Sequence, residues 1–123
     1  MDLLRTHDER VANLPDFPFA PHYVELGADL NRLRMHYLDE GPPDGEVVLL
    51  LHGEPSWSYL YRKMVPVLVD AGLRAVAIDL VGCGRSDKPT LRDGATYPPH
   101  VDWTWLFYPS AASDNFTLLD LSA

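Results

Sequence analysis

The sequence predicts an α/β fold built around a partly parallel sheet. Two uninterrupted aliphatic runs, residues 47–51 and 75–78, have the pattern of strands that are covered on both faces. Between them, residues 58–71 place apolar side chains at three-and-four spacing, which is typical of an amphipathic helix. A strand, a helix and a strand in this order form a βαβ unit, whose crossover we expect to be right-handed.

The first 20 residues predict an irregular arm that lies over the surface, because they contain prolines and show little periodicity. The apolar part of this arm consists of Pro15, Phe17, Pro18 and Phe19.

Two alternating segments follow the arm. Residues 22–26 and 33–38 each alternate between apolar and polar side chains, and the turn-rich residues 27–31 lie between them. An antiparallel, hairpin-like pair of strands is therefore expected. The sequence GPPDG at residues 41–45 ends the second strand.

The helix predicted inside the βαβ unit has recognisable ends. Ser56 or Ser58 is a candidate N-cap, and Gly72 is placed to end the helix. Pro66 is the one internal residue that disfavours a helix. A second, aromatic-rich helix is expected within residues 97–107, with its two prolines confined to the first turn.

Composition excludes several classes of function. With 18 acidic and 10 basic residues, the formal net charge of −8 disfavours binding to nucleic acid or to anionic lipid. No apolar stretch approaches the roughly 18 residues that a membrane span needs, and residues 1–10 lack the apolar core of a signal peptide. We therefore expect a cytoplasmic protein. The single cysteine, Cys83, cannot form an internal disulfide or a multi-cysteine zinc site.

The first motif is HGEPSW at residues 52–57, where a buried strand gives way to a helix. In a parallel sheet this is the carboxyl end, where ligands bind, and Gly53 lets the backbone present an N–H group to a substrate. Such an N–H stabilises a developing negative charge, as in an oxyanion hole. A tight turn with no further role is the alternative interpretation.

The second motif, DLVGCGRSDKP at residues 79–89, follows the next strand. It lacks the third glycine of a dinucleotide-binding loop and the Gly-Lys-Ser/Thr end of a P-loop, so a nucleotide is not supported. We predict a structural loop, in which glycines allow a sharp bend and polar side chains hydrogen-bond the loop. These polar residues are Asp79, Arg85, Ser86 and Asp87.

Together the two motifs resemble the haloalkane dehalogenases of the α/β-hydrolase superfamily. HGEPSWSYLYRKM at residues 52–64 is similar to that family's segment after its third strand. Residues 79–89 are similar to its next loop, where an aromatic residue usually occupies the position of Cys83. The arm at residues 5–23, MHYLDEGP at 35–42 and residues 97–105 also fit, so the resemblance covers roughly residues 4–105.

The resemblance implies an α/β-hydrolase fold with an eight-stranded, mostly parallel sheet, flanking helices and a helical cap. This chain is expected to hold an incomplete version, in which residues 21–105 form the N-terminal strands with one βαβ unit and no cap domain. The family uses no metal and no cofactor. Its nucleophilic aspartate displaces halide from a small halogenated alkane, and a histidine-activated water then hydrolyses the ester.

The resemblance also implies roles for the first motif. The backbone N–H of Glu54 corresponds to one of two groups that hold the oxyanion, in a turn formed with His52, Gly53 and Pro55. The Glu54-Pro55 bond corresponds to one that the family keeps in the cis form. Glu54 further indicates the branch in which two tryptophans bind the halide, and neither of them can be assigned in this chain.

The chain departs from the family where the nucleophile is expected. The turn that reads approximately Gln-Asp-Trp-Gly is absent, and the nearest candidate nucleophile is Asp120, although no tryptophan, glycine or helix follows it. None of the five histidines corresponds to the family's base. Trp57, Trp103 and Trp105 are expected to belong to the core rather than to a halide site. Residues 106–123 form a divergent tail, for which a shifted reading frame is one explanation, and the chain alone is expected to be inactive.

Two other interpretations stay open. An epoxide hydrolase shares the scaffold and an aspartate nucleophile, and the His-Gly-X-Pro turn fits both families, whereas residues 54–64 favour a dehalogenase. Alternatively, the chain is a non-enzymatic remnant or interaction module that associates, with itself or with a partner, through an exposed sheet edge.

Overall fold

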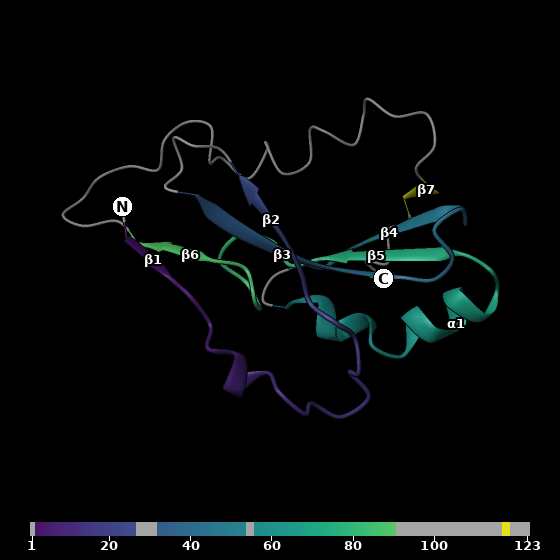
Figure 1. The fold of residues 1–123 in the computed structure, drawn as a ribbon, viewed down its shortest axis with the longest axis horizontal. Helices are drawn as coiled ribbons and strands as arrows, with labels where there is room; N and C mark the ends of the chain where they lie inside the picture. Colours follow the sequence, from purple (N-terminus) through teal and green to yellow (C-terminus); the bar gives the residue numbers. More distant parts are fainter. Residues whose placement is uncertain (1, 27–31, 54–55, 91–116, 119–123) are drawn as a thin grey trace.

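The computed structural model describes residues 2–26, 32–53, 56–90 and 117–118 (Figure 1). Five strands form the main sheet in the order β2-β3-β5-β4-β7, and two short strands, β1 and β6, form a separate ribbon. The strands of the main sheet are β2 (His22–Leu26), β3 (Leu33–Glu40), β4 (Val47–Leu51), β5 (Arg74–Ile78) and β7 (Thr117–Leu118). The sheet is mixed, because β4 pairs in parallel with β5 and β7 while β3 pairs antiparallel with β2 and β5.

The predicted βαβ unit is confirmed. Strands β4 and β5 run in parallel with Val47 opposite Arg74 and Leu51 opposite Ile78, and the helix α1 (Met64–Asp70) connects them. The predicted antiparallel pair is also present, with His22 opposite Tyr37 in β2 and β3. Because Leu51 and Ile78 lie side by side, the two sequence motifs that follow them begin at the same edge of the sheet.

The single helix predicted for residues 58–71 is wrong in its first half. The structure has a 3-10 helix, η3 (Ser58–Tyr61), followed by the shorter α1, and no side-chain hydrogen bond caps the start of either helix. Pro66 explains the break, since in a helix that began at Ser58 its ring would meet the preceding turn and its missing N–H would leave a carbonyl unpaired. In α1 it occupies the first turn, where no N–H is needed.

The end of α1 follows the prediction. Gly72 has φ +80°, and its N–H donates to Val69 O at 2.9 Å, while the N–H of Leu73 donates to Leu68 O at 3.0 Å. This is the Schellman arrangement, which favours glycine because the left-handed conformation is strained for other residues.

The N-terminal arm is more ordered than the prediction of an irregular segment, which was wrong for two short elements. Strand β1 (Asp2–Leu4) pairs antiparallel with β6 (Lys88–Thr90), and a 3-10 helix, η1, covers Asp8–Arg10. Three-residue strands are too short to show a period. This pairing also joins segments more than 80 residues apart in the chain, so no local pattern predicts it.

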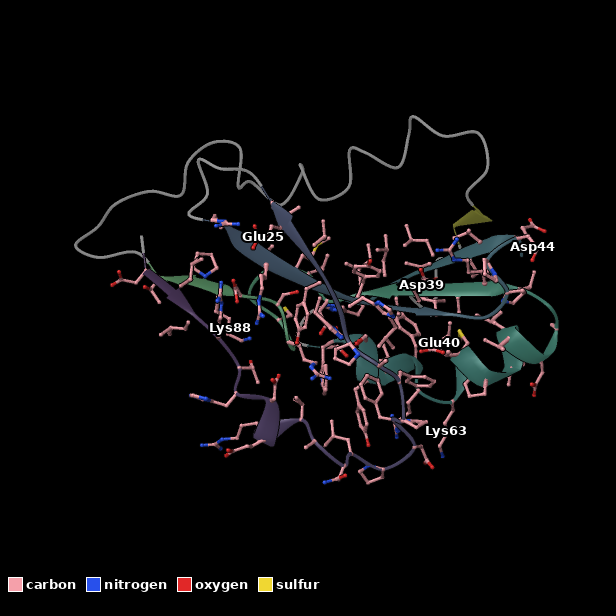
Figure 2. All side chains as sticks on the ribbon, viewed as in Figure 1. Glu25, Asp39, Glu40, Asp44, Lys63 and Lys88 are labelled. Carbon is pink, nitrogen blue, oxygen red and sulfur yellow. The ribbon has the colours of Figure 1, made fainter. Side chains whose placement is uncertain are left out.

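The main core lies between one face of the sheet, α1 and the arm (Figure 2). Leu38, Leu50 and Val65 are fully buried there, and Phe17 of the arm joins them with 8% of its surface exposed. The buried members of this cluster are Phe17, Leu38, Val48, Leu50, Tyr61, Val65, Ala75 and Ala77. Charged side chains such as Glu25, Asp44 and Lys63 lie at the periphery (Figure 2).

The two faces of the parallel pair differ, although cover on both was predicted. Along β4 and β5, alternate residues are buried and half-buried, so that Val48 and Leu50 face the core while Leu49 and Leu51 retain some exposure. The physical reason is that α1 and η3, the described helices of the βαβ unit, pack against the buried face. None of the described helices is long and apolar enough to cross a membrane.

Candidate functional site: two joined loops at the carboxyl edge of the sheet

Two loops leave the carboxyl ends of the neighbouring parallel strands. The β4 loop comprises residues 52–57 and the β5 loop comprises residues 79–87. The region around them is rich in buried polar side chains, and several of these have no solvent exposure. The buried polar residues are His36, His52, Ser58, Asp79, Ser86 and Asp87.

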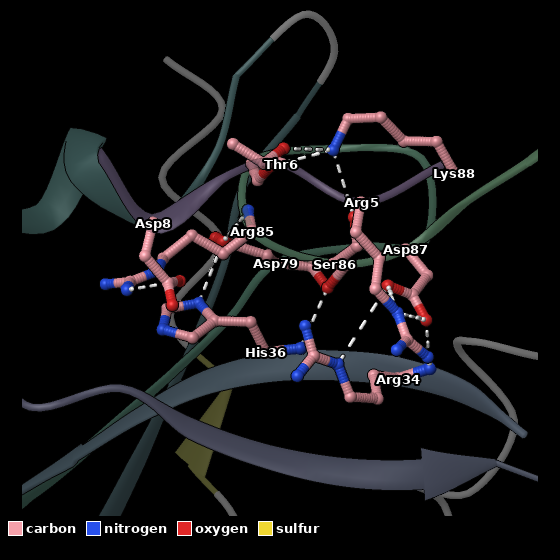
Figure 3. Close-up of polar contacts among 11 residues, drawn as sticks. Arg5, Thr6, Asp8, Arg34, His36, Asp79, Arg85, Ser86, Asp87 and Lys88 are labelled. Atoms are coloured by element: carbon pink, nitrogen blue, oxygen red, sulfur yellow. Dashed lines mark hydrogen bonds and ion pairs between the residues drawn. The ribbon is translucent and has the colours of Figure 1, made fainter. Parts of the chain in front are cut away.

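Asp79 is the centre of this polar region (Figure 3). Its Oδ1 accepts the backbone N–H of Ser58 at 2.7 Å, and its Oδ2 accepts the backbone N–H of Arg85 at 2.9 Å. The carboxylate is fully buried, so these bonds replace the water that it gives up on folding. One side chain thereby joins the start of η3, the β5 loop and strand β3.

His36 of β3 completes the coordination of Asp79. Because an ionised carboxylate can only accept, the His36 Nδ1–H donates to Asp79 Oδ2, over 2.8 Å. Ser86 also bonds to both residues of this pair. Its hydroxyl donates to the backbone oxygen of Asp79 at 2.6 Å and accepts the backbone N–H of His36 at 2.9 Å. Sequence reasoning did not predict this pairing, for which the available signal was a carboxylate placed directly after a buried strand.

The charge state of Asp79 follows from opposing effects. Burial by itself raises the pKa of this carboxyl, but the hydrogen bonds from His36, from the Arg85 N–H and from Ser58 outweigh it and hold the pKa below its usual value. Asp79 is therefore a carboxylate at neutral pH. Its acceptor capacity is used by the fold, and it is not available as a nucleophile.

His52 joins the β4 loop directly to the β5 loop. Its Nε2 accepts the backbone N–H of Leu80 at 3.0 Å, so the ring proton is on Nδ1, which donates to Gly53 O at 3.0 Å. Only 3% of the His52 surface is exposed. With both nitrogens engaged, His52 cannot act as the base that activates water, and the fully buried His36 has no contact with solvent through which to do so.

The far end of the β5 loop is tied to the N-terminal arm. The carboxylate of Asp87 accepts Arg5 Nε–H at 3.0 Å and the backbone N–H of Arg34 at 2.8 Å. The ammonium of Lys88 donates to Thr6 Oγ1, Gly84 O and Ser86 O at 2.8 to 3.0 Å. Burial lowers the pKa of Lys88, and the nearby negative charges oppose this effect only in part.

Two glycines give the β5 loop its shape. Gly82 has φ +92° and Gly84 has φ +49°, in the left-handed region that is costly for other residues. A Cβ on Gly84 would also collide with the carboxylate of Asp79 and with Cβ of Trp57. The prediction that this motif is a structural loop, bent at its glycines and hydrogen-bonded by its polar residues, agrees with this geometry.

The residues predicted for the β4 loop are placed only in part. The structure describes His52 and Gly53, whereas Glu54 and Pro55 lie outside the described residues, as does the candidate nucleophile Asp120. Strand β7, which comes just before Asp120, pairs in parallel with β4.

Trp57 belongs to the core, as expected. Its ring stacks on that of Tyr59 with centroids 5.5 Å apart and contacts Phe17 of the arm at 5.5 Å. Trp103 and Trp105 lie outside the described residues. An open groove of about 700 Å³ runs along the arm between Asp8 and Phe19 and includes Arg85, but it contains none of the predicted site residues.

The chain is similar to known proteins in sequence. Residues 46–122 match the model of the alpha/beta hydrolase fold family. The chain is 55% identical over 119 residues to a haloalkane dehalogenase of Psychrobacter cryohalolentis, a match that covers 96% of this chain and 39% of that protein. The chain thus spans about 40% of the length of the curated relatives it matches.

Solved structures agree with these matches. The structure of a tetrameric haloalkane dehalogenase from Paraglaciecola agarilytica superimposes with a TM-score of 0.78 at 46% identity, covering 96% of this chain and 40% of that one. An epoxide hydrolase from Vigna radiata superimposes over 60% of this chain and 21% of that one, with a TM-score of 0.50 at 36% identity.

Proposed function

Since the chain belongs to the α/β-hydrolase fold family, we propose that it provides the oxyanion-binding scaffold of a hydrolase that cleaves carbon–halogen bonds. The observation that carries this proposal is the position of the His52-Gly53 turn, which leaves β4 at the carboxyl edge of the parallel strands and is bonded to the β5 loop. The similarity to haloalkane dehalogenases over 96% of the chain supports the choice of reaction.

In the proposed reaction, an aspartate carboxylate attacks the carbon that bears the halogen, and the halide leaves with the bonding electrons. Water then attacks the carbonyl carbon of the alkyl ester and releases the alcohol. In this second step, negative charge develops on the carbonyl oxygen of the ester, and the backbone N–H of Glu54 donates a hydrogen bond to that oxygen. The chain contributes this donor and the loops around it, while nucleophile, base and halide site are expected from other residues.

Dehalogenation is favoured over epoxide opening by the extent of the similarity. The dehalogenase structure matches 96% of this chain, whereas the epoxide hydrolase structure matches 60%. The chain by itself is proposed to be inactive. No carboxylate among the described residues both lies at the position expected for the nucleophile and has an oxygen that is available to attack the substrate.

A chimeric enzyme tests the proposal. Residues 5–105 of this chain replace the matched segment of the Psychrobacter haloalkane dehalogenase, and bromide release from 1-bromobutane is measured. We expect the chimera to turn over within about tenfold of its parent and the 123-residue chain to stay at background. A folded chimera without activity, or turnover by the chain alone, would contradict the proposal.

Two substitutions at one position test the role of the Glu54 N–H in the chimera. Glu54→Pro removes the N–H and is expected to lower kcat by about 100- to 1000-fold, the usual effect of losing one oxyanion donor. Glu54→Gln keeps the N–H and removes the charge, so kcat should change little. Thermal melting of both variants separates a lost donor from a lost fold.

Association through the sheet edge is a second, non-enzymatic proposal. Strand β2 forms one edge of the main sheet among the described strands, and Val24 on it is 39% exposed. Size-exclusion chromatography over a concentration series distinguishes a defined oligomer, which supports this proposal, from a monomer, which contradicts it.

A further inference from the structure

We propose that His52 and Asp79 are positioning residues that hold the segment 53–57 from both of its ends. Four residues form what we call the loop clamp: His52 and Ser58 on either side of that segment, and Asp79 and Leu80 after β5. The hydrogen bonds of the clamp are observed in the structure and do not depend on the proposed function. Its consequence for catalysis rests on the proposed function, because it concerns the N–H group that the segment presents.

The first end of the segment is held by the imidazole of His52. Its Nε2 accepts the Leu80 N–H at 3.0 Å and its Nδ1–H donates to Gly53 O at 3.0 Å. The ring therefore joins the carbonyl of the segment's first residue to the backbone of the neighbouring loop. Since His52 is almost completely buried, no water competes for its bond to the Leu80 N–H.

The second end is held by the carboxylate of Asp79, whose Oδ1 accepts the Ser58 N–H at 2.7 Å. Both residues are fully buried. Asp79 is itself held by His36 and by the Arg85 N–H, so it has little freedom to follow the segment if the segment moves. Trp57 adds apolar support through its contacts with Tyr59 and Phe17.

The two anchors on the β5 side are consecutive residues, which makes the clamp short and stiff. The side-chain carboxylate of Asp79 holds one end of the five-residue segment and the backbone N–H of the next residue, Leu80, holds the other, so the two anchor points are fixed relative to each other. Fixing both ends of the segment reduces the reorganisation that a donor within it would need when charge develops on the substrate. The clamp therefore acts on the rate of reaction through the placement of the donor, not through contact with substrate.

Hydrogen exchange in the full 123-residue chain tests the clamp without reference to activity. His52→Leu removes the acceptor for the Leu80 N–H and keeps a side chain of similar bulk, and we expect amide exchange at Leu80 and across 53–58 to rise at least tenfold. His52→Gln restores an acceptor at a similar reach and should return exchange to within about threefold of the original. Val65→Ala, a truncation of the buried core away from the clamp, is the matched control and should raise exchange evenly over the sheet. Unchanged exchange across 53–58 in His52→Leu, or an effect no more local than that of Val65→Ala, would overturn the proposal.

The same variants in the chimera test the consequence for catalysis. His52→Leu should lower kcat at least tenfold with KM within about twofold, His52→Gln should recover most of kcat, and Val65→Ala should leave both constants nearly unchanged below its melting temperature. An equal loss of kcat in the leucine and alanine variants would overturn the positioning role. A chimera that is inactive before any substitution refutes the proposed function, while the exchange measurement still decides on the clamp.

Discussion

The two ends of the parallel strands β4 and β5 differ in the burial and hydrogen bonding of their charged side chains. At the carboxyl ends, Asp79 and Asp87 are fully buried and accept several hydrogen bonds each. At the amino ends, Arg74 makes a bidentate ion pair with Asp39 that remains partly exposed on both sides. Buried, multiply bonded carboxylates hold loops rigidly, whereas an exposed pair adds little order, and the difference matches the expectation that ligands bind at the carboxyl edge.

The largest expected effect is that of Asp79→Ala. The substitution leaves the backbone N–H groups of Ser58 and Arg85 and the ring Nδ1–H of His36 without an acceptor, and we expect the free energy of unfolding to fall by about 3–5 kcal/mol. Urea denaturation followed by circular dichroism measures this loss. Asp79→Asn, which retains one carbonyl acceptor, should lose less, and equal losses would show that the hydrogen bonds are not the cause.

Substitution of Gly84 should produce the next largest effect. Gly84→Ala combines a left-handed φ with a collision against Asp79 and Trp57, and an unfolding free energy lower by about 2–4 kcal/mol is expected. Gly82→Ala is the matched control, because its φ is also positive while no atom lies within 4 Å of the added Cβ. It should lower the stability by only about 1–2 kcal/mol. Equal effects of the two substitutions in thermal or urea unfolding would contradict the proposed close contact.

Acid should affect the carboxyl edge more than the amino edge. The pKa of Asp79 is lowered in the folded protein, so its contribution to stability is complete above the ordinary value of 3.8 and is lost as the pH falls through the lower, folded-state pKa. Stability measured between neutral pH and pH 2 should therefore fall less steeply in Asp79→Asn than in the original chain. The pKa of Asp39 is lowered too, by the hydrogen bond from Arg74, but its exposure to solvent weakens the effect. Asp39→Asn should leave the acid profile nearly unchanged.

The smallest expected effect is at the amino edge itself. Arg74→Gln removes the ion pair with Asp39, and the midpoint of urea unfolding should shift less than for Gly82→Ala. Salt screens exposed charges, so about 0.5 M sodium chloride should reduce the difference between Arg74→Gln and the original chain. A shift as large as that of Asp79→Asn would remove the contrast between the two edges.

Much of the fold and part of the candidate site could be predicted from the sequence. Strand β4 and strand β5 follow directly from their aliphatic runs, and the Gly72 end of α1 follows from a single residue type. The resemblance to haloalkane dehalogenases, drawn from two loop motifs, is confirmed by the matched proteins and structures. The roles of Glu54 and Asp120 stay predictions, because neither residue lies within the described part of the chain.

The errors have two physical causes, one local and one that depends on distant partners. The division of the predicted helix depends on where Pro66 falls within its turn, and the β1–β6 pairing depends on a partner more than 80 residues away. The pairing of His36 with Asp79 was not predicted, because the strand neighbours of His36 do not reveal the carboxylate that lies 43 positions later. The last two features are properties of two distant segments, and a local pattern contains only one of them.

By itself, the sequence determined strands β2, β3, β4 and β5, the Gly72 end of α1 and the family that the loops resemble, because burial period, glycine and proline act over a few residues. The tertiary structure alone decided the strand order β2-β3-β5-β4-β7, the His36–Asp79 pair and the loop clamp. The reason is that a buried polar group must find its partner within about 3 Å, and only the assembled sheet brings such partners together.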